Sequence, residues 1–163
     1  MKIHIGIVAF IAVTAVAILR PSVSAEQQPT STQQAPPASS TEPAQSVWDG
    51  IYTEDQAARG NALYSQTCAA CHAADLSGGE TAPALAGPDF KSNWSGLTVN
   101  DLFERIKASM PADNAGSLSR QQTADILAFV FSINRFPAGK SELVREAEIL
   151  KSIKFEAFKP ETK

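Results

Sequence analysis

Both cysteines of this 163-residue chain lie in one pentapeptide, Cys68-Ala69-Ala70-Cys71-His72, and this C-x-x-C-H motif limits what the chain can fold around. Two thiols at this spacing, on the last turn of a helix, can form thioethers to the two vinyl groups of one haem. The next residue then presents its imidazole to the iron. The motif therefore predicts one covalent haem c, with Cys68 and Cys71 as attachment points and His72 as an iron ligand.

Other uses of a C-x-x-C pair fit the sequence less well. A structural zinc site needs four Cys or His ligands, and the only other histidine, His4, lies in the apolar N-terminal segment. A thioredoxin-like redox pair requires a βαβ setting, which the sequence does not show. A simple disulfide remains open, because an exported chain meets an oxidising compartment. The position of His72 directly after the pair favours haem.

The iron of such a haem needs a sixth ligand, and a methionine thioether is the usual choice in electron-transfer sites. Apart from Met1, the only methionine is Met110, which lies in a Ser-Met-Pro sequence. Any one methionine is more often a core residue. Here no other histidine follows the N-terminal segment, so we expect His72 and Met110 to bind the iron together.

Helical patterns surround the motif, and no segment alternates with the period of a strand. Thr53 caps a first helix that leads into the cysteines. A Thr-x-x-Asp capping box at Thr98 starts a second helix over 99–109. A third helix, capped by Ser119 with Gln122 three residues later, covers 120–133 and has one broad apolar face. The Gly- and Pro-rich stretch 76–96 predicts a loop. The fold class is therefore all-α.

Residues 52–135 resemble a class I (monohaem) bacterial cytochrome c. Besides the haem motif, the matching pieces are Gly60, Tyr64, Pro83-Ala84-Leu85, Ser109-Met110-Pro111 and Asp125-Ile126-Leu127-Ala128-Phe129. The resemblance implies that helices wrap around the haem and that the first and last helices cross. Gly60 and Tyr64 would then pack against the last helix, where their partners would be Ile126 and Phe129.

The same resemblance implies roles for three further residues around the haem. Pro83 would accept a hydrogen bond from His72 through its carbonyl, which fixes the ring of a metal-bound imidazole. Leu85 would pack against the haem. Trp94 resembles a tryptophan near the haem propionates, although a half-buried loop aromatic fits the sequence equally well.

The two ends of the chain carry different signals. Residues 1–25 predict a signal peptide, with an apolar run and a small-residue cleavage site; an uncleaved membrane anchor facing the periplasm is the alternative. Residues 26–46, rich in Gln, Pro, Ser and Thr, predict a disordered linker. The cytochrome c domain would cover 47–136. A C-terminal extension, 137–163, would pack on it, with Ser141 capping a short amphipathic helix.

These features favour a periplasmic single-electron carrier over an enzyme. A haem peroxidase needs an open iron face with acid–base groups, and a two-haem peroxidase needs a second motif. A gas sensor of the four-helix type carries its haem motif near the C-terminus, whereas most of this fold follows His72.

Partners follow from the same resemblance. The extension loosely resembles those of cytochromes paired with quinoprotein dehydrogenases, so we expect such a donor and a terminal oxidase or other acceptor. No run of Lys or Arg marks a nucleic-acid surface, and the formal net charge is −3.

Overall fold

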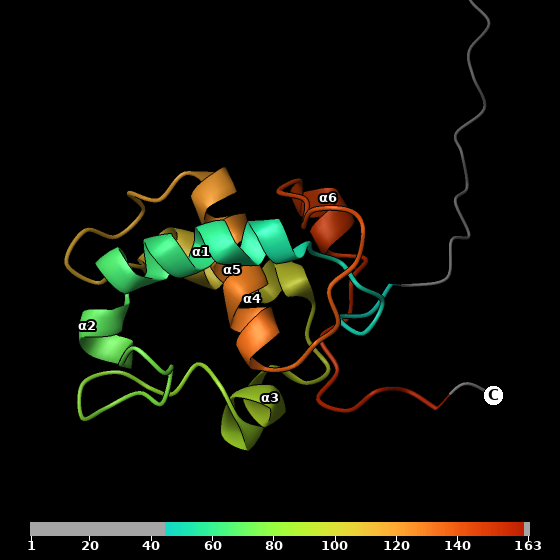
Figure 1. Cartoon of the computed structure of the whole chain (residues 1–163), viewed down its shortest axis with the longest axis horizontal. Coiled ribbons are helices and arrows are strands. Elements are labelled where there is room, and N and C mark those ends of the chain that lie inside the picture. Colours follow the sequence, from blue (N-terminus) through green and yellow to red (C-terminus); the bar gives the residue numbers. More distant parts are fainter. Residues whose placement is uncertain (1–44, 162–163) are drawn as a thin grey trace, which may run out of the picture. The chain divides into compact units, whose positions relative to one another are not determined.

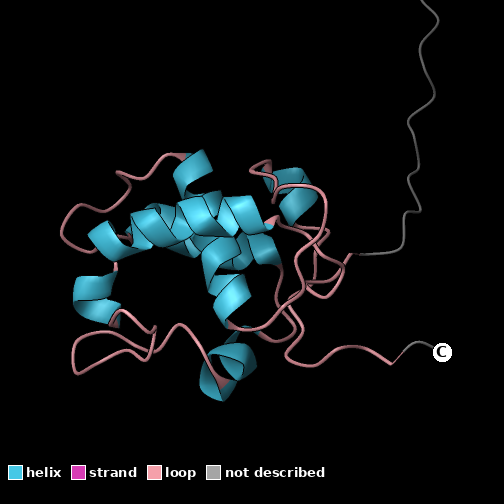
Figure 2. Ribbon diagram, in the orientation of Figure 1, coloured by secondary structure: helices cyan, strands magenta, loops and turns pink. Residues whose placement is uncertain are grey.

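The structure is a computed structural model and describes residues 45–161. The predicted signal peptide or anchor (1–25) and the predicted linker up to residue 44 lie outside the described residues. The described chain forms six helices, which are α1 (Glu54–Thr67), α2 (Ala69–His72), α3 (Pro88–Trp94), α4 (Val99–Ser109), α5 (Arg120–Ile133) and α6 (Ala147–Leu150). It contains two isolated β-bridges but no β-strand (Figure 2), which confirms the all-α prediction.

The three long helices begin at the predicted caps. Thr53 Oγ1 accepts a hydrogen bond from the Gln56 N–H (3.2 Å) at the start of α1. Capping boxes at Thr98 and Ser119 start α4 and α5. Each side-chain cap satisfies a backbone donor that the first helical turn leaves free, which stabilises a helix by about 1 kcal/mol.

Helices α1 and α5 cross at Gly60 (Figure 1). A Cβ atom on Gly60 would lie 1.8 Å from the backbone oxygen of Asp125 and 3.0 Å from the Phe129 Cβ. One turn along α1, the buried Tyr64 ring packs 5.3 Å from the Phe129 ring, centroid to centroid. The predicted contact with Phe129 is present, while the atom nearest to Gly60 belongs to the Asp125 backbone rather than to Ile126.

Two short helices depart from the sequence-based expectation. The cysteines do not continue α1, because α1 ends at Thr67 and α2 forms a separate turn after Cys68. The predicted 76–96 loop contains α3. Pro88 occupies the first turn of α3, where its missing N–H costs nothing, and Phe90 is buried in the core. A continuous loop was therefore the wrong prediction for this segment.

The C-terminal helix is shorter than predicted, and Ser141 does not cap it. Helix α6 begins after Glu146. Upstream, the Leu143 N–H donates to the Gln56 Oε1 (2.6 Å), and the Leu143 carbonyl accepts from the Gln56 Nε2 (3.1 Å). Since this buried glutamine uses both backbone groups of Leu143, the segment is held in an irregular conformation against α1.

The rest of the extension completes the hydrophobic core. Phe155 is fully buried, with its ring 5.8 Å from Phe90, 6.2 Å from Phe131 and 5.4 Å from Phe136, centroid to centroid. None of the helices among residues 45–161 is long and apolar enough to span a membrane.

The extension also pairs with the start of the described chain. The Lys154 N–H donates to the Gln45 carbonyl (2.7 Å), and the Val47 N–H donates to the Lys154 carbonyl (3.0 Å). Ser46, which lies between Gln45 and Val47 in the sequence, is buried. Gln45 and Ser46, which the sequence placed at the end of the linker, are therefore part of the folded domain.

Candidate functional site

The C-x-x-C-H pentapeptide forms a single helical turn directly after α1. The N–H groups of Cys71 and His72 both donate to the Cys68 carbonyl (3.1 and 3.0 Å). Both cysteines are free; Cys68 is half-buried and Cys71 is exposed. Burial raises the pKa of the Cys68 thiol, while a contact with Thr67 lowers it. Two thiols and one imidazole therefore share one turn, and they form no disulfide.

His72 is buried and one of its ring nitrogens is already engaged. Its Nδ1 lies 2.8 Å from the Pro83 carbonyl oxygen. Since that oxygen can only accept, Nδ1 carries the proton and Nε2 is left for a metal ion. The loop between His72 and Pro83 passes through Gly78, whose N–H donates to the His72 carbonyl (2.9 Å). Gly78 has a φ of 75°, and a Cβ there would lie 2.4 Å from the Ala84 nitrogen, so glycine is required.

Tyr64 holds the residue that follows the histidine. Its hydroxyl donates to the Ala73 carbonyl (2.7 Å), and Ala73 has a left-handed φ of 64°. Burial, with smaller contributions from Cys68 and Asp75, raises the pKa of Tyr64 to about 12. The phenol is therefore a neutral donor at ordinary pH, and its bond fixes the turn beyond His72.

Asn134, directly after α5, binds the loop that follows Pro83, at Leu85 and Gly87. Its Nδ2 donates to the carbonyls of Leu85 and Val130 (both 2.9 Å), and its Oδ1 accepts from the Gly87 N–H (3.1 Å). The residue is only 2% exposed, so these bonds are shielded from water. The segment that carries Pro83 is thus fixed between His72 and α5.

The second predicted ligand comes from a different element. Met110 is the C-cap of α4, and its backbone leaves the helical conformation there (φ −121°, ψ 153°). Its side chain is half-buried, as are Leu85 and Trp94. The Trp94 indole N–H forms no hydrogen bond with another described residue, so the position near propionates stays a prediction.

Two supporting residues were not identified from the sequence in these roles. Tyr64 was expected to pack on α5, but its hydroxyl bond to Ala73 was not foreseen. Asn134 was not singled out at all. Its place directly after the last apolar residue of a helix is a typical C-terminal signal, which could have drawn attention to it.

The residues present fit a covalent haem. Two free thiols and an imidazole with an available Nε2 lie on one turn, and half-buried apolar side chains such as Leu85 and Trp94 are at hand to cover a large apolar ring. No three His, Cys, Asp or Glu side chains gather into a metal site within residues 45–161.

Known proteins resemble the chain over this same region. Residues 55–130, which contain the pentapeptide, Pro83 and Met110, match a family described as "Cytochrome C oxidase, cbb3-type, subunit III". Among the curated proteins none matches the chain.

Among solved structures, the chain is similar to one titled "Crystal Structure of the Sulfane Dehydrogenase SoxCD from Paracoccus pantotrophus". The identity is 24% and the TM-score is 0.45, over 70% of this chain and 66% of that chain. The chain thus spans just under two thirds of the length of that relative.

Proposed function

We propose that this chain, which carries one class I c-type cytochrome domain with a covalently bound haem c, is a single-electron carrier with axial ligands His72 and Met110. The family match over 55–130 implies electron transfer through a c-type haem. The axial pair, the location and the partners named below are the proposed part.

One observation carries the proposal that His72 binds the iron. The 2.8 Å contact between His72 Nδ1 and the Pro83 carbonyl leaves Nε2 as the only ring nitrogen able to bind iron. The same helical turn holds Cys68 and Cys71, whose thiols supply the two covalent attachments. Metal-binding histidines are regularly held by such a carbonyl, which also makes the imidazole a better ligand.

The haem supplies a one-electron couple when bound, and the chain's own residues set its conditions. With haem bound, the thioether of Met110 would hold the iron together with His72, which would close the iron to added ligands and raise the reduction potential relative to a second histidine. Leu85 and Trp94 limit the access of water. With both axial positions filled by side chains, a carrier is favoured over an enzyme that binds substrate at iron.

We place this carrier in the periplasm, because haem is attached outside the cytoplasm in bacterial cytochromes of this type. Its donor would be a dehydrogenase, and the resemblance of the C-terminal extension supports one of the quinoprotein class. Its acceptor would be a terminal oxidase or another redox protein. The segment 1–25 would direct export or, if uncleaved, hold the chain at the membrane.

The experiment substitutes the proposed ligands in the haem-loaded chain. Wild-type protein should keep one haem per chain through denaturing acid extraction and should show the weak long-wavelength sulfur–iron band when oxidised. Met110→Ala should lose this band and bind carbon monoxide rapidly, whereas Met110→His should lower the reduction potential. His72→Ala should yield little haem-loaded protein.

The exposed Leu97 provides the control, since Leu97→Ala should leave the spectrum unchanged. A Met110→Ala variant that keeps both the band and a closed iron would refute the ligand assignment. Haem that extracts freely from the wild-type chain would refute covalent attachment.

A further inference from the structure

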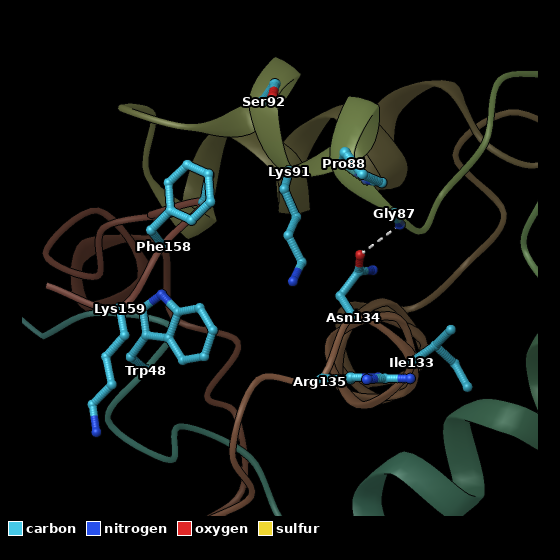
Figure 3. A pocket seen from close by; sticks show the side chains of 11 residues that line it. Trp48, Gly87, Pro88, Lys91, Ser92, Ile133, Asn134, Arg135, Phe158 and Lys159 are labelled. Carbon is cyan, nitrogen blue, oxygen red and sulfur yellow. Dashed lines mark hydrogen bonds between the residues drawn. The ribbon is translucent and has the colours of Figure 1, made fainter.

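A pocket of about 370 Å³ lies between the start of α3, the end of α5 and the C-terminal segment (Figure 3). Three parts of its wall, Trp48 and the ranges 133–135 and 157–159, come from outside the range 55–130 that matches the cytochrome family, while 87–88 and 91–92 come from within it. Much of the pocket wall therefore lies beyond the part of the chain that the family match covers, and the size of the pocket is in the range of binding pockets, about 300 to 1,000 Å³.

The charged residues of the pocket all have the same sign. Lys91, Arg135 and Lys159 contribute to the wall, and no Asp or Glu does. This concentration of positive charge contrasts with a chain whose formal net charge is −3. None of the three cations forms an ion pair with another described residue. A cluster of this kind attracts an anionic partner.

Lys91 lies at the centre of the pocket. Its side chain runs from α3 into the middle of the pocket, with Trp48 and Phe158 on one side and Asn134 on the other (Figure 3). The Nζ atom is 5.8 Å from the Trp48 ring and 5.2 Å from the Phe136 ring, measured to the centroids. A half-buried ammonium group beside aromatic rings has lost part of its hydration, and a bound carboxylate would compensate for that loss.

Arg135 occupies a backbone position that favours glycine. It follows the C-cap of α5 with a left-handed φ of 64°, and the next N–H, of Phe136, bonds back to the Phe131 carbonyl (3.1 Å). Glycine is the usual residue at this point of a helix terminus. Backbone strain of this kind is often retained at functional positions, and Arg135 lines the pocket, with its side chain running across the end of α5 towards Ile133 (Figure 3).

We propose that this pocket docks an acidic segment of a redox partner protein, with a carboxylate on Lys91 and an apolar side chain against Trp48 and Phe158. Phe158 is 86% exposed, as expected of an aromatic residue that packs only in a complex. The redox nature of the partner rests on the function proposed above.

The pocket adjoins the segment that supports the histidine. Gly87 and Asn134 line the pocket and are hydrogen-bonded to each other (3.1 Å). Four residues upstream of Gly87, the Pro83 carbonyl contacts His72. A partner docked here would therefore touch the loop that holds the haem ligand.

The test uses the full, haem-loaded chain in its reduced state, labelled with ¹⁵N, and a capped peptide of sequence Asp-Glu-Phe-Asp-Glu. The chain has two tryptophans, so the indole N–H of Trp48 reports on the pocket and that of Trp94 serves as an internal reference. The Trp48 signal should shift saturably with peptide, and salt should weaken binding, because charges are screened beyond about 10 Å at 0.1 M. The neutral peptide Asn-Gln-Phe-Asn-Gln should bind far more weakly.

Three variants locate the site. Lys91→Met keeps the apolar stem but removes the charge, and should raise the Kd of the peptide about fivefold. Arg135→Gly should raise the Kd about twofold while raising the melting temperature. Lys107→Met is the matched control, since Lys107 Nζ bonds to the Gly116 carbonyl away from the pocket lining, and it should leave the Kd unchanged.

Several results would overturn the docking proposal. One is a Trp48 signal that does not shift with the acidic peptide. The others are binding of the neutral peptide as tight as that of the acidic one, or a rise in Kd in Lys107→Met as large as that in Lys91→Met. A response to phosphatidylglycerol vesicles but not to the peptide would instead assign the patch to a membrane. Haem content and reduction by ascorbate, measured on the same sample, test the carrier function separately, because a redox-active chain that ignores the peptide refutes docking alone.

Discussion

Gly60 shows how strictly a single residue can be fixed by its neighbours. Alanine favours a helix interior over glycine by about 1 kcal/mol, so sequence propensity alone predicts that Gly60→Ala stabilises α1. The added Cβ would, however, lie 1.8 Å from the Asp125 backbone oxygen, and a backbone atom cannot rotate away. We expect a net loss of about 1 to 3 kcal/mol in the free energy of unfolding, because α1 and α5 must separate.

Denaturant unfolding of the haem-loaded chain measures this change. Ala62→Gly, at an exposed position of the same helix, is the control and should cost only the propensity difference of about 1 kcal/mol. A Gly60→Ala variant more stable than the wild type would show that the helices do not cross so closely.

Tyr64 links a buried phenol to the stability of the protein at high pH. Its pKa in the folded protein is about 12, above the value of about 10 for an unfolded chain. The folded state therefore favours the protonated phenol, so this contribution is fully present below about pH 10 and is lost as the pH rises towards 12. Tyr64→Phe should flatten this alkaline loss and, at pH 8, should cost about 1 kcal/mol for the missing bond to Ala73.

Unfolding titrations at pH 8 and pH 11 compare the two proteins. Burial also raises the pKa of Tyr52, so the free energy of unfolding of Tyr64→Phe should still fall somewhat between pH 8 and pH 11. Tyr52→Phe should remove the part of this fall that Tyr52 contributes. Equal slopes in the wild type and Tyr64→Phe would contradict the assignment of the slope to this residue.

At the scale of helices, local chemistry predicted the starts well and the ends poorly. Thr53, Thr98 and Ser119 cap the helices that the sequence assigned to them, because a cap depends on residues within one turn. Helix α3 was missed among the glycines and prolines around it. The predicted helix from Ser141 is mostly irregular, since Gln56, far away in the sequence, binds the backbone of Leu143.

The candidate site divides in the same way. The pentapeptide and Met110 follow from residue types and spacing, whereas Pro83 was found only through a family resemblance. Asn134 lies far from Gly87 in the sequence, and their hydrogen bond exists only because α5 brings them together. No local pattern records such a contact.

The hydrogen bonds between Asn134 and the loop at 85–87, called the Asn134 clamp below, yield a prediction at the scale of helices. Asn134→Ala removes three hydrogen bonds, to Leu85, Gly87 and Val130, and should lower the free energy of unfolding by about 2 kcal/mol. It should also speed amide exchange at Gly87, whose N–H loses its acceptor. Asn134→Asp keeps an acceptor but no donor, so it should retain Gly87 protection while still losing stability. Unchanged Gly87 exchange in Asn134→Ala would show that the Asn134 clamp does not hold the loop.

Within residues 45–161, the C-terminal extension pairs with the first residues of the described chain. The extension passes between the start of the described chain and the segment before α4. Val47 and Leu97 provide backbone partners for it, through the Val47 bond to Lys154 (3.0 Å) and the Phe155 bond to Leu97 (2.9 Å). The extension therefore belongs to the cooperative unit, although the family match ends at residue 130.

Two phenylalanines of the extension separate its structural part from its surface part. Phe155 is fully buried among three other phenylalanine rings, and Phe155→Ala should cost about 3 to 5 kcal/mol in the free energy of unfolding. Phe158 is 86% exposed, so Phe158→Ala should change stability by less than about 0.5 kcal/mol. Thermal or denaturant unfolding of the haem-loaded variants gives both values. If the two variants are equally stable, or if Phe155→Ala unfolds the extension while α1 and α5 keep the wild-type midpoint, then the extension is an appendage and not part of the core.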